Sequence, residues 1–125
     1  KKAFIVEDEY DIQDILQATL RAFIKHSVQE NPLPKLAGNS SRADITIEEL
    51  GLLIEVKFVR SPNDQKMLVE DFAQDIMYYS KWEHLREFFY LIYNSADLRD
   101  PEELESLSGA KEINGRIFNS KVILA

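Results

Sequence analysis

Two neighbouring stretches of the chain, residues 43–48 and 52–59, alternate between apolar and polar side chains. That alternation is typical of half-buried β-strands, whose successive side chains point to opposite faces. The apolar faces hold Ile45, Ile47, Ile54, Val56 and Phe58. Because only residues 49–51 separate the two stretches, the pattern predicts an antiparallel hairpin with a tight connection.

Two longer stretches repeat apolar residues at the spacing of an amphipathic helix. They cover about residues 8–25 and 61–82, and Ser61-Pro62-Asn63-Asp64 is a helix-start signal for the second. The other predicted elements are a loop or irregular edge strand at 31–41, a strand at 87–93, a short helix at 101–107 and a strand at 121–124. This order predicts one α/β or α+β domain with helices around a mixed central sheet.

Length and composition narrow the class of protein. The 125 residues suit one domain, and 45% hydrophobic residues suffice for a core. The sequence has no cysteine, which excludes disulfides and zinc–thiolate sites, and it has no apolar run long enough for a membrane span. The net charge of −7 counts against strong stand-alone affinity for nucleic acid. The absence of cysteine fits a reducing compartment such as the cytoplasm. Because the chain begins with Lys1 rather than Met, we expect a processed product or a piece of a longer protein.

The predicted hairpin register brings charged side chains together. With the turn centred between Glu49 and Leu50, Asp44 lies opposite Glu55, and directly opposed residues project from one face. Lys57 follows Glu55 by two residues and shares that face. A turn of different length by one residue would put Asp44 and Glu55 out of phase.

Two carboxylates beside an ammonium indicate metal-assisted chemistry. Carboxylates about 5 Å apart repel by roughly 3 kcal/mol at an effective dielectric of about 20, and a divalent cation removes that cost. Mg²⁺ favours carboxylate oxygens with water and substrate phosphate, and Lys57 could position the attacking water. A solvated Glu–Lys surface pair is the alternative, but residues 52–59 are otherwise apolar. From repulsion alone, we expect Asp44→Ala to leave metal-free stability unchanged.

Further candidates flank this cluster. Glu9 falls on the inward side of the first helix and could be a ligand, although an acidic residue there also favours the helix dipole. Arg42, Arg60 and Lys66 could bind phosphate, although solvated surface positions are the alternative.

The second predicted helix adds two pairs at i, i+4 spacing, Gln74 with Tyr78 and Asp75 with Tyr79. Either pair could meet the backbone or the substrate. Tyr79 also fits the apolar stripe of the helix, so a place in the core is the alternative for it.

The order of these motifs resembles the PD-(D/E)XK nuclease superfamily, in that Asp44 is followed after ten residues by Glu55-Val56-Lys57. More closely, the stretch from Glu9 to about Leu104 resembles DpnII/MboI-like predicted restriction endonuclease domains of bacterial defence systems. The similar segments are EYDIQDIL, AGNSSRADITIEELGLLIEVKFVR, DFAQDIMYY and FFYLIYNSADLRDPEELE. Ala43 stands where the superfamily name has Pro, at a position that varies.

The resemblance implies a fold and a metal site. The fold is a restriction-endonuclease-like αβββαβ core. Asp44 and Glu55 would hold Mg²⁺ or Mn²⁺, with the Val56 carbonyl as a further ligand. Lys57 would be the catalytic lysine, and Glu9 the acid of the first helix. The resemblance therefore implies a metal-dependent phosphodiesterase.

The loop before Asp44 also matches the family, and it is implied to approach the substrate. Its matching residues are Gly38, Ser40, Ser41 and Arg42. The predicted substrate-binding residues are Ser41, Arg42, Arg60 and Gln74.

Three functions are compatible with these observations. The first is a DNA endonuclease domain of restriction or anti-phage defence, fused to further domains and acting as a homodimer if it cuts both strands. The second is an RNA- or tRNA-cleaving toxin of the same fold. The third is a non-enzymatic interaction module, which would have no use for the trio of Asp44, Glu55 and Lys57. No membrane partner is expected.

Overall fold

The two alternating stretches form adjacent antiparallel strands. In the computed structural model, which describes residues 5–21, 27–32 and 42–125, β2 spans Arg42–Ile47 and β3 spans Leu52–Phe58. Thr46 pairs with Leu53, so the predicted register is confirmed. A 3₁₀ turn joins the strands and ends at Gly51, whose φ of 60° lies in the left-handed region.

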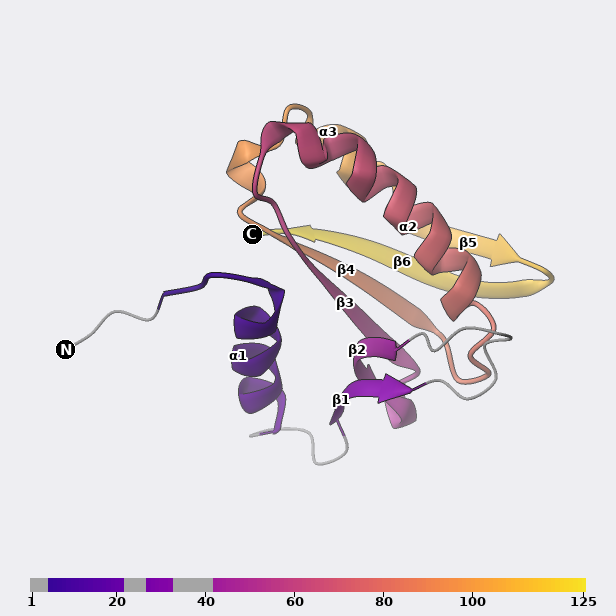
Figure 1. Cartoon of the computed structure of the whole chain (residues 1–125). Helices are drawn as coiled ribbons and strands as arrows, with labels where there is room; N and C mark the ends of the chain where they lie inside the picture. Colours follow the sequence, from indigo (N-terminus) through magenta and orange to yellow (C-terminus); the bar gives the residue numbers. More distant parts are fainter. Residues whose placement is uncertain (1–4, 22–26, 33–41) are drawn as a thin grey trace.

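The strands of the described residues form one mixed sheet with the order β1-β2-β3-β4-β6-β5 (Figure 1). The remaining strands are β1 (Ser27–Pro32), β4 (Glu87–Tyr93), β5 (Gly109–Ile113) and β6 (Arg116–Leu124). β3, β4 and β6 run parallel, whereas β1, β2 and β5 pair antiparallel with their neighbours. The mixed sheet and the αβββαβ order at the start of the chain confirm the predicted fold class.

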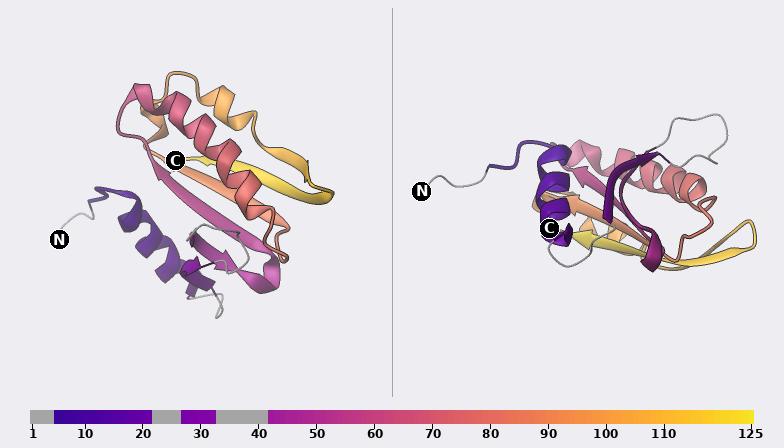
Figure 2. Two further views of the ribbon diagram at one scale, coloured as in Figure 1. Left: turned by 45° about the vertical axis from the view of Figure 1, so that its right-hand side comes forward. Right: turned by 90° about the horizontal axis from the view of Figure 1, so that it is seen from below.

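Helices cover both faces of this sheet (Figures 1 and 2). They are α1 (Glu9–Arg21), α2 (Gln65–Tyr79) and α3 (Pro101–Glu105). On one face, Ile12 of α1 packs with Ile54 and Val56 of β3. On the other face, the apolar stripe of α2 packs with Phe88 and Tyr90 of β4. Because β3 is central and covered on both faces, charged groups on it have little access to water.

The start of α2 is built as the sequence signal predicts. Ser61 caps a 3₁₀ turn, Pro62–Asp64, with its side chain accepting from the Asn63 N–H, and Asp64 closes a capping box by accepting from the Ser61 N–H. This cap fixes the direction in which the chain leaves β3, and therefore where α2 lies across the sheet.

Three predictions about elements need correction or completion. α2 ends at Tyr79 rather than near Trp82, because the N–H groups of Lys81 and Trp82 bond to carbonyls three residues back, as in a turn, instead of four. The last strand is longer than predicted, and the antiparallel partner β5 was missed. The first helix is described only to Arg21, so its predicted end lies outside the described residues. The edge strand β1 begins at Ser27, before the predicted range 31–41, and most of that range lies outside the described residues. None of the described helices is long and apolar enough to cross a membrane.

Candidate active site

Asp44 lies where β2 and β3 stop pairing. The last paired residues are Ile45 and Ile54, and beyond them the Asp44 carboxylate accepts a hydrogen bond of 2.7 Å from the Val56 N–H. The side chain of Asp44 therefore takes the place of a backbone acceptor on the neighbouring strand. This hydrogen bond is a stabilising contribution that an estimate from repulsion alone omits.

Glu55 is buried on the α2 face of β3, with a side chain only 10% exposed. The Tyr79 hydroxyl donates to its carboxylate at 3.2 Å, and the Lys57 Nζ lies 3.6 Å away. Burial raises the pKa of Glu55 well above its usual range, and the nearby charges of Asp44 and Asp75 raise it further. Lys57 and Tyr79 oppose these effects without cancelling them.

Lys57 stands among carboxylates from two elements. Its Nζ lies 3.6 Å from Glu55 on β3, and 3.6 Å from each of Asp71 and Asp75 on α2. Burial lowers the pKa of Lys57, but the charges of Asp75, Glu55 and Asp71 outweigh it, so the pKa is raised. Lys57 is therefore a fully charged ammonium at neutral pH.

Asp75 is the second buried acid of this cluster. Burial raises its pKa to about 6 and Asp71 adds to the effect, while Lys57 works against it. Its Oδ2 is buried and makes no hydrogen bond, because the Lys57 ammonium lies slightly beyond hydrogen-bond distance. An oxygen in this state can accept a further proton or cation.

Asp71, Asp75 and Tyr79 lie at i, i+4 and i+8, so they form one stripe of α2 that faces the charged side of β3. Sequence reasoning identified the Asp75–Tyr79 pair but did not place it beside Lys57, and it missed Asp71. The spacing of Asp71 and Asp75, next to the apolar stripe of the same helix, could have indicated from the sequence that both acids lie close to the sheet.

Two carboxylates of this cluster, Asp44 and Glu55, fit a divalent cation. Four carboxylates (Asp44, Glu55, Asp71 and Asp75) surround one ammonium, and the charges of Asp44 and Asp75 add to the effect of burial in raising the pKa of Glu55, so the excess negative charge has a cost. Among the described residues, no three His, Cys, Asp or Glu side chains are already arranged as metal ligands. Mg²⁺ does not require such an arrangement, because it is commonly held by one or two carboxylates with water and phosphate.

Glu9 and Arg60, predicted to be a ligand and a phosphate-binding residue, contact each other. The guanidinium of Arg60 lies 3.3 Å from one oxygen of Glu9 and 3.4 Å from the other. Arg60 also stacks over the Phe58 ring, at 5.0 Å from its centroid. Burial is the largest single effect and raises the pKa of Glu9, but the hydrogen bond and the charge of Arg60, together with smaller contributions, outweigh it, so the pKa is lowered. Lys57 acts in the same direction, which places Glu9 within electrostatic range of the cluster.

The remaining predicted substrate-binding residues are less fully placed. Ser41 lies outside the described residues, and Arg42 is described only as the first residue of β2. Gln74 is exposed on α2, where it lines a shallow hollow together with Asp71 and Tyr78. Because Asp71 of the acidic stripe also lines this hollow, a nucleic-acid strand lying along α2 could contact both the hollow and the stripe.

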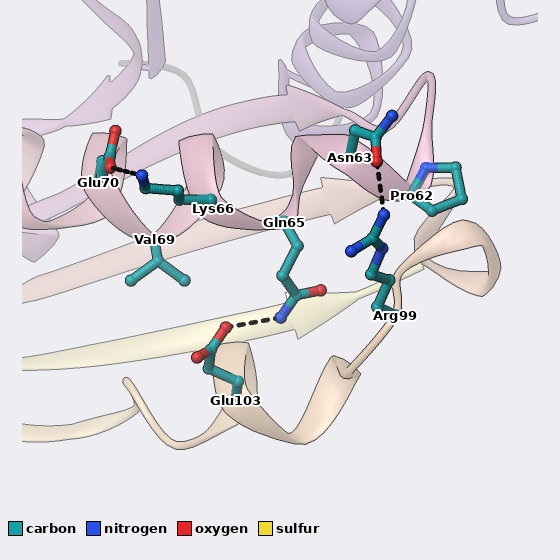
Figure 3. Close-up of a pocket in the computed structure, with 8 residues that line it drawn as sticks. All are labelled: Pro62, Asn63, Gln65, Lys66, Val69, Glu70, Arg99 and Glu103. Carbon is teal, nitrogen blue, oxygen red and sulfur yellow. Dashed lines mark hydrogen bonds and ion pairs between the residues drawn. The ribbon is translucent and has the colours of Figure 1, made fainter.

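Another hollow lies between α2 and α3 and contains none of the cluster residues (Figure 3). Gln65 donates to Glu103 at 2.8 Å, and Arg99 donates to Asn63 at 2.6 Å. The first pair joins α2 to α3, and the second joins the turn before α2 to the segment before α3, so these side chains serve the packing of the two helices.

Comparison with known proteins identifies the family. The family model described as REase_DpnII-MboI matches residues 1–118. Neither the curated proteins nor the solved structures gave a match. The matched range contains the whole carboxylate cluster and nearly all of the chain, and membership of a restriction endonuclease family implies a nuclease that cleaves phosphodiester bonds. The chain therefore belongs to the DpnII/MboI family of restriction endonucleases.

Proposed function

We propose that this domain is a metal-dependent endonuclease that hydrolyses DNA phosphodiester bonds. The observation that carries the proposal is the cluster of Asp44, Glu55 and Lys57 at the point where β2 and β3 separate. Family membership supports DNA as the substrate. The cluster supports the metal dependence, since it collects more negative charge than one ammonium can neutralise.

Asp44, Glu55 and the Val56 carbonyl are the proposed ligands of Mg²⁺ or Mn²⁺. On an extended strand the N–H and C=O of one residue point to the same edge, so the Val56 carbonyl points toward Asp44 as its N–H does. The bound ion would supply charge neutralisation at a phosphate and a more acidic water. Glu9 can join this set only by giving up its ion pair with Arg60.

Lys57 is the proposed catalytic lysine. As a charged ammonium on the same face as Glu55, it would donate hydrogen bonds to the attacking water or to the phosphate oxygen on which charge develops. The proposed contacts of the phosphate backbone are Arg60, Arg42, Ser41 and Gln74. Arg60 becomes available for phosphate whenever Glu9 turns to the metal, so one rearrangement would serve both roles.

The test is cleavage of labelled duplex DNA, single-stranded DNA and tRNA with Mg²⁺, with Mn²⁺ or with chelator. We expect duplex cleavage that requires metal and falls at least about a hundredfold in Lys57→Ala. Lys81→Ala, an exposed lysine after α2, is the matched control and should cleave like the wild type.

The outcomes separate the alternatives. Cleavage of tRNA instead of DNA would indicate an RNA-cleaving toxin, and an active Lys57→Ala protein would refute the role of Lys57. Metal binding without cleavage would indicate that a partner domain is needed. If neither metal binding nor cleavage is found, the domain is an interaction module. Within the leading proposal, the domain serves cytoplasmic restriction or anti-phage defence, and acts as a homodimer if it cuts both strands.

A further inference from the structure

The acidic stripe of α2 has no role in the proposed chemistry so far, yet it contacts the lysine on which that chemistry depends. Asp75 and Asp71 each place Oδ2 3.6 Å from the Lys57 Nζ. Both belong to α2, whereas Lys57 and Glu55 belong to β3. The ammonium is therefore held from two independent elements.

The two carboxylates of α2 differ in their surroundings. The Asp75 side chain is 18% exposed and has a buried oxygen without a hydrogen bond, whereas the Asp71 side chain is 35% exposed at the rim. Water screens an exposed ion pair far more than a buried one. Of the two, Asp75 therefore interacts more strongly with Lys57.

Glu55 cannot hold Lys57 on its own once the site is loaded. A carboxylate oxygen that binds a divalent cation loses much of its attraction for a nearby ammonium, because the cation repels that ammonium. Lysine has a flexible four-carbon side chain, so an ammonium without a fixed partner samples many positions. An anion outside the metal ligand set is then needed to keep Lys57 over the reacting phosphate.

We propose that Asp75 is the positioning residue of Lys57, holding its ammonium in place from α2 while Glu55 serves the metal. This inference rests on the proposed function, in which Glu55 is a ligand and Lys57 is catalytic. Asp75 itself touches neither substrate nor metal in this role. It acts through Lys57 and fixes the geometry on which a hydrogen-bonding lysine depends.

The first test needs no nuclease activity. The rate at which acetic anhydride acylates Lys57 is measured by peptide mass spectrometry in metal-free buffer. Asp75→Asn should raise this rate roughly three- to tenfold, because the amine loses a carboxylate that keeps it charged and in place. Asp75→Glu should stay close to the wild type, Asp71→Asn should change less than Asp75→Asn, and exposed Glu70→Gln is the matched control on the same helix.

The second test uses duplex DNA at saturating Mg²⁺. Asp75→Asn should lower kcat about tenfold or more and leave KM within about twofold, with partial recovery in Asp75→Glu. Circular dichroism confirms the fold of each variant, and Asp75→Ser replaces Asp75→Asn if the latter does not fold.

An unchanged Lys57 acylation rate in folded Asp75→Asn would overturn the inference, as would an unchanged kcat or an equal response in Asp71→Asn. If the wild type neither binds metal nor cleaves nucleic acid, the proposed function fails. The acylation test then still decides whether Asp75 holds Lys57.

Discussion

At the scale of single residues, the site joins groups that stabilise and destabilise the domain. Asp44 accepts a short hydrogen bond from the Val56 N–H, but its charge also raises the pKa of Glu55. Glu55 gains Tyr79 and Lys57 as partners, but burial outweighs both. Such opposed contributions are typical of functional sites, where charges are held for chemistry at some cost in stability.

The two roles of Asp44 can be separated by a pair of substitutions. Asp44→Asn keeps an oxygen for the Val56 N–H and removes the charge, whereas Asp44→Ala removes both. In chelator, we expect Asp44→Ala to be about 1–3 kcal/mol less stable than Asp44→Asn in urea unfolding. Equal stability of the two variants would mean that the hydrogen bond contributes nothing. Both variants should lose metal binding.

The raised pKa of Asp75 predicts an unusual pH dependence. Between its usual pKa and the folded value of about 6, the folded state binds more protons than the unfolded state, so stability falls as the pH rises. The ionisation of Asp75 lowers the free energy of unfolding by at most roughly 3 kcal/mol, and the full loss is reached above about pH 6. Metal-free urea unfolding from pH 4 to 7 should show a shallower fall in Asp75→Asn, while Glu70→Gln should follow the wild type. Identical slopes in all three proteins would contradict the shift.

At the scale of elements, the site depends on how each strand and helix begins and ends. The 3₁₀ turn after β2 ends at Gly51, whose carbonyl accepts from the Arg86 and Glu87 N–H groups at the start of β4. This turn sets the hairpin register that places Asp44 beside β3. The capped start of α2 sets the position of Asp71 and Asp75 in the same way.

Gly51 is required for two reasons. Its φ of 60° strains any residue with a Cβ, and an added Cβ would overlap the His84 carbonyl oxygen and approach the Arg86 side chain. Gly115 has a φ of 80° but open space around it, so a substitution there reports the backbone strain without the steric overlap. We expect Gly115→Ala to cost about 1 kcal/mol and Gly51→Ala at least about 2 kcal/mol more in thermal or urea unfolding. Equal costs would show that the turn moves to admit the methyl group.

At the scale of the whole molecule, the sheet concentrates charge at one point of its face. β2, β3 and α2 together bring four carboxylates to Lys57, although α2 is packed on the sheet by an apolar core. The domain holds these charges by burying Leu68, Phe72 and Phe88 next to them. The stability of the whole domain should therefore respond to any ion that enters the cluster.

Divalent metal should stabilise the folded domain. At about a hundred times the dissociation constant, Mg²⁺ or Mn²⁺ should add roughly 2.7 kcal/mol to the free energy of unfolding, seen as a rise in the melting temperature. Glu55→Gln should abolish the rise, because it removes a proposed ligand while retaining an acceptor for the Tyr79 hydroxyl. Glu102→Gln, an exposed position on α3, is the control and should respond like the wild type. A full rise in Glu55→Gln would place the ion elsewhere.

The sequence alone was sufficient for whatever depends on local spacing. Alternation and a short connection determine the register of β2 and β3, because side chains repeat every two residues and a slip would expose the apolar face. The same reasoning could have found β5, since Asn114-Gly115, with φ values of 51° and 80°, is a strong hairpin signal.

Only the tertiary structure decided which distant elements meet. Asp75 lies 18 positions after Lys57, and Glu9 lies 51 positions before Arg60, and nothing in the local pattern of either segment specifies these contacts. The angle at which α2 crosses the sheet turns its acidic stripe toward Lys57, and that angle follows from packing across the core. Local spacing thus determined the residues of the β3 face, and packing decided which charges surround them.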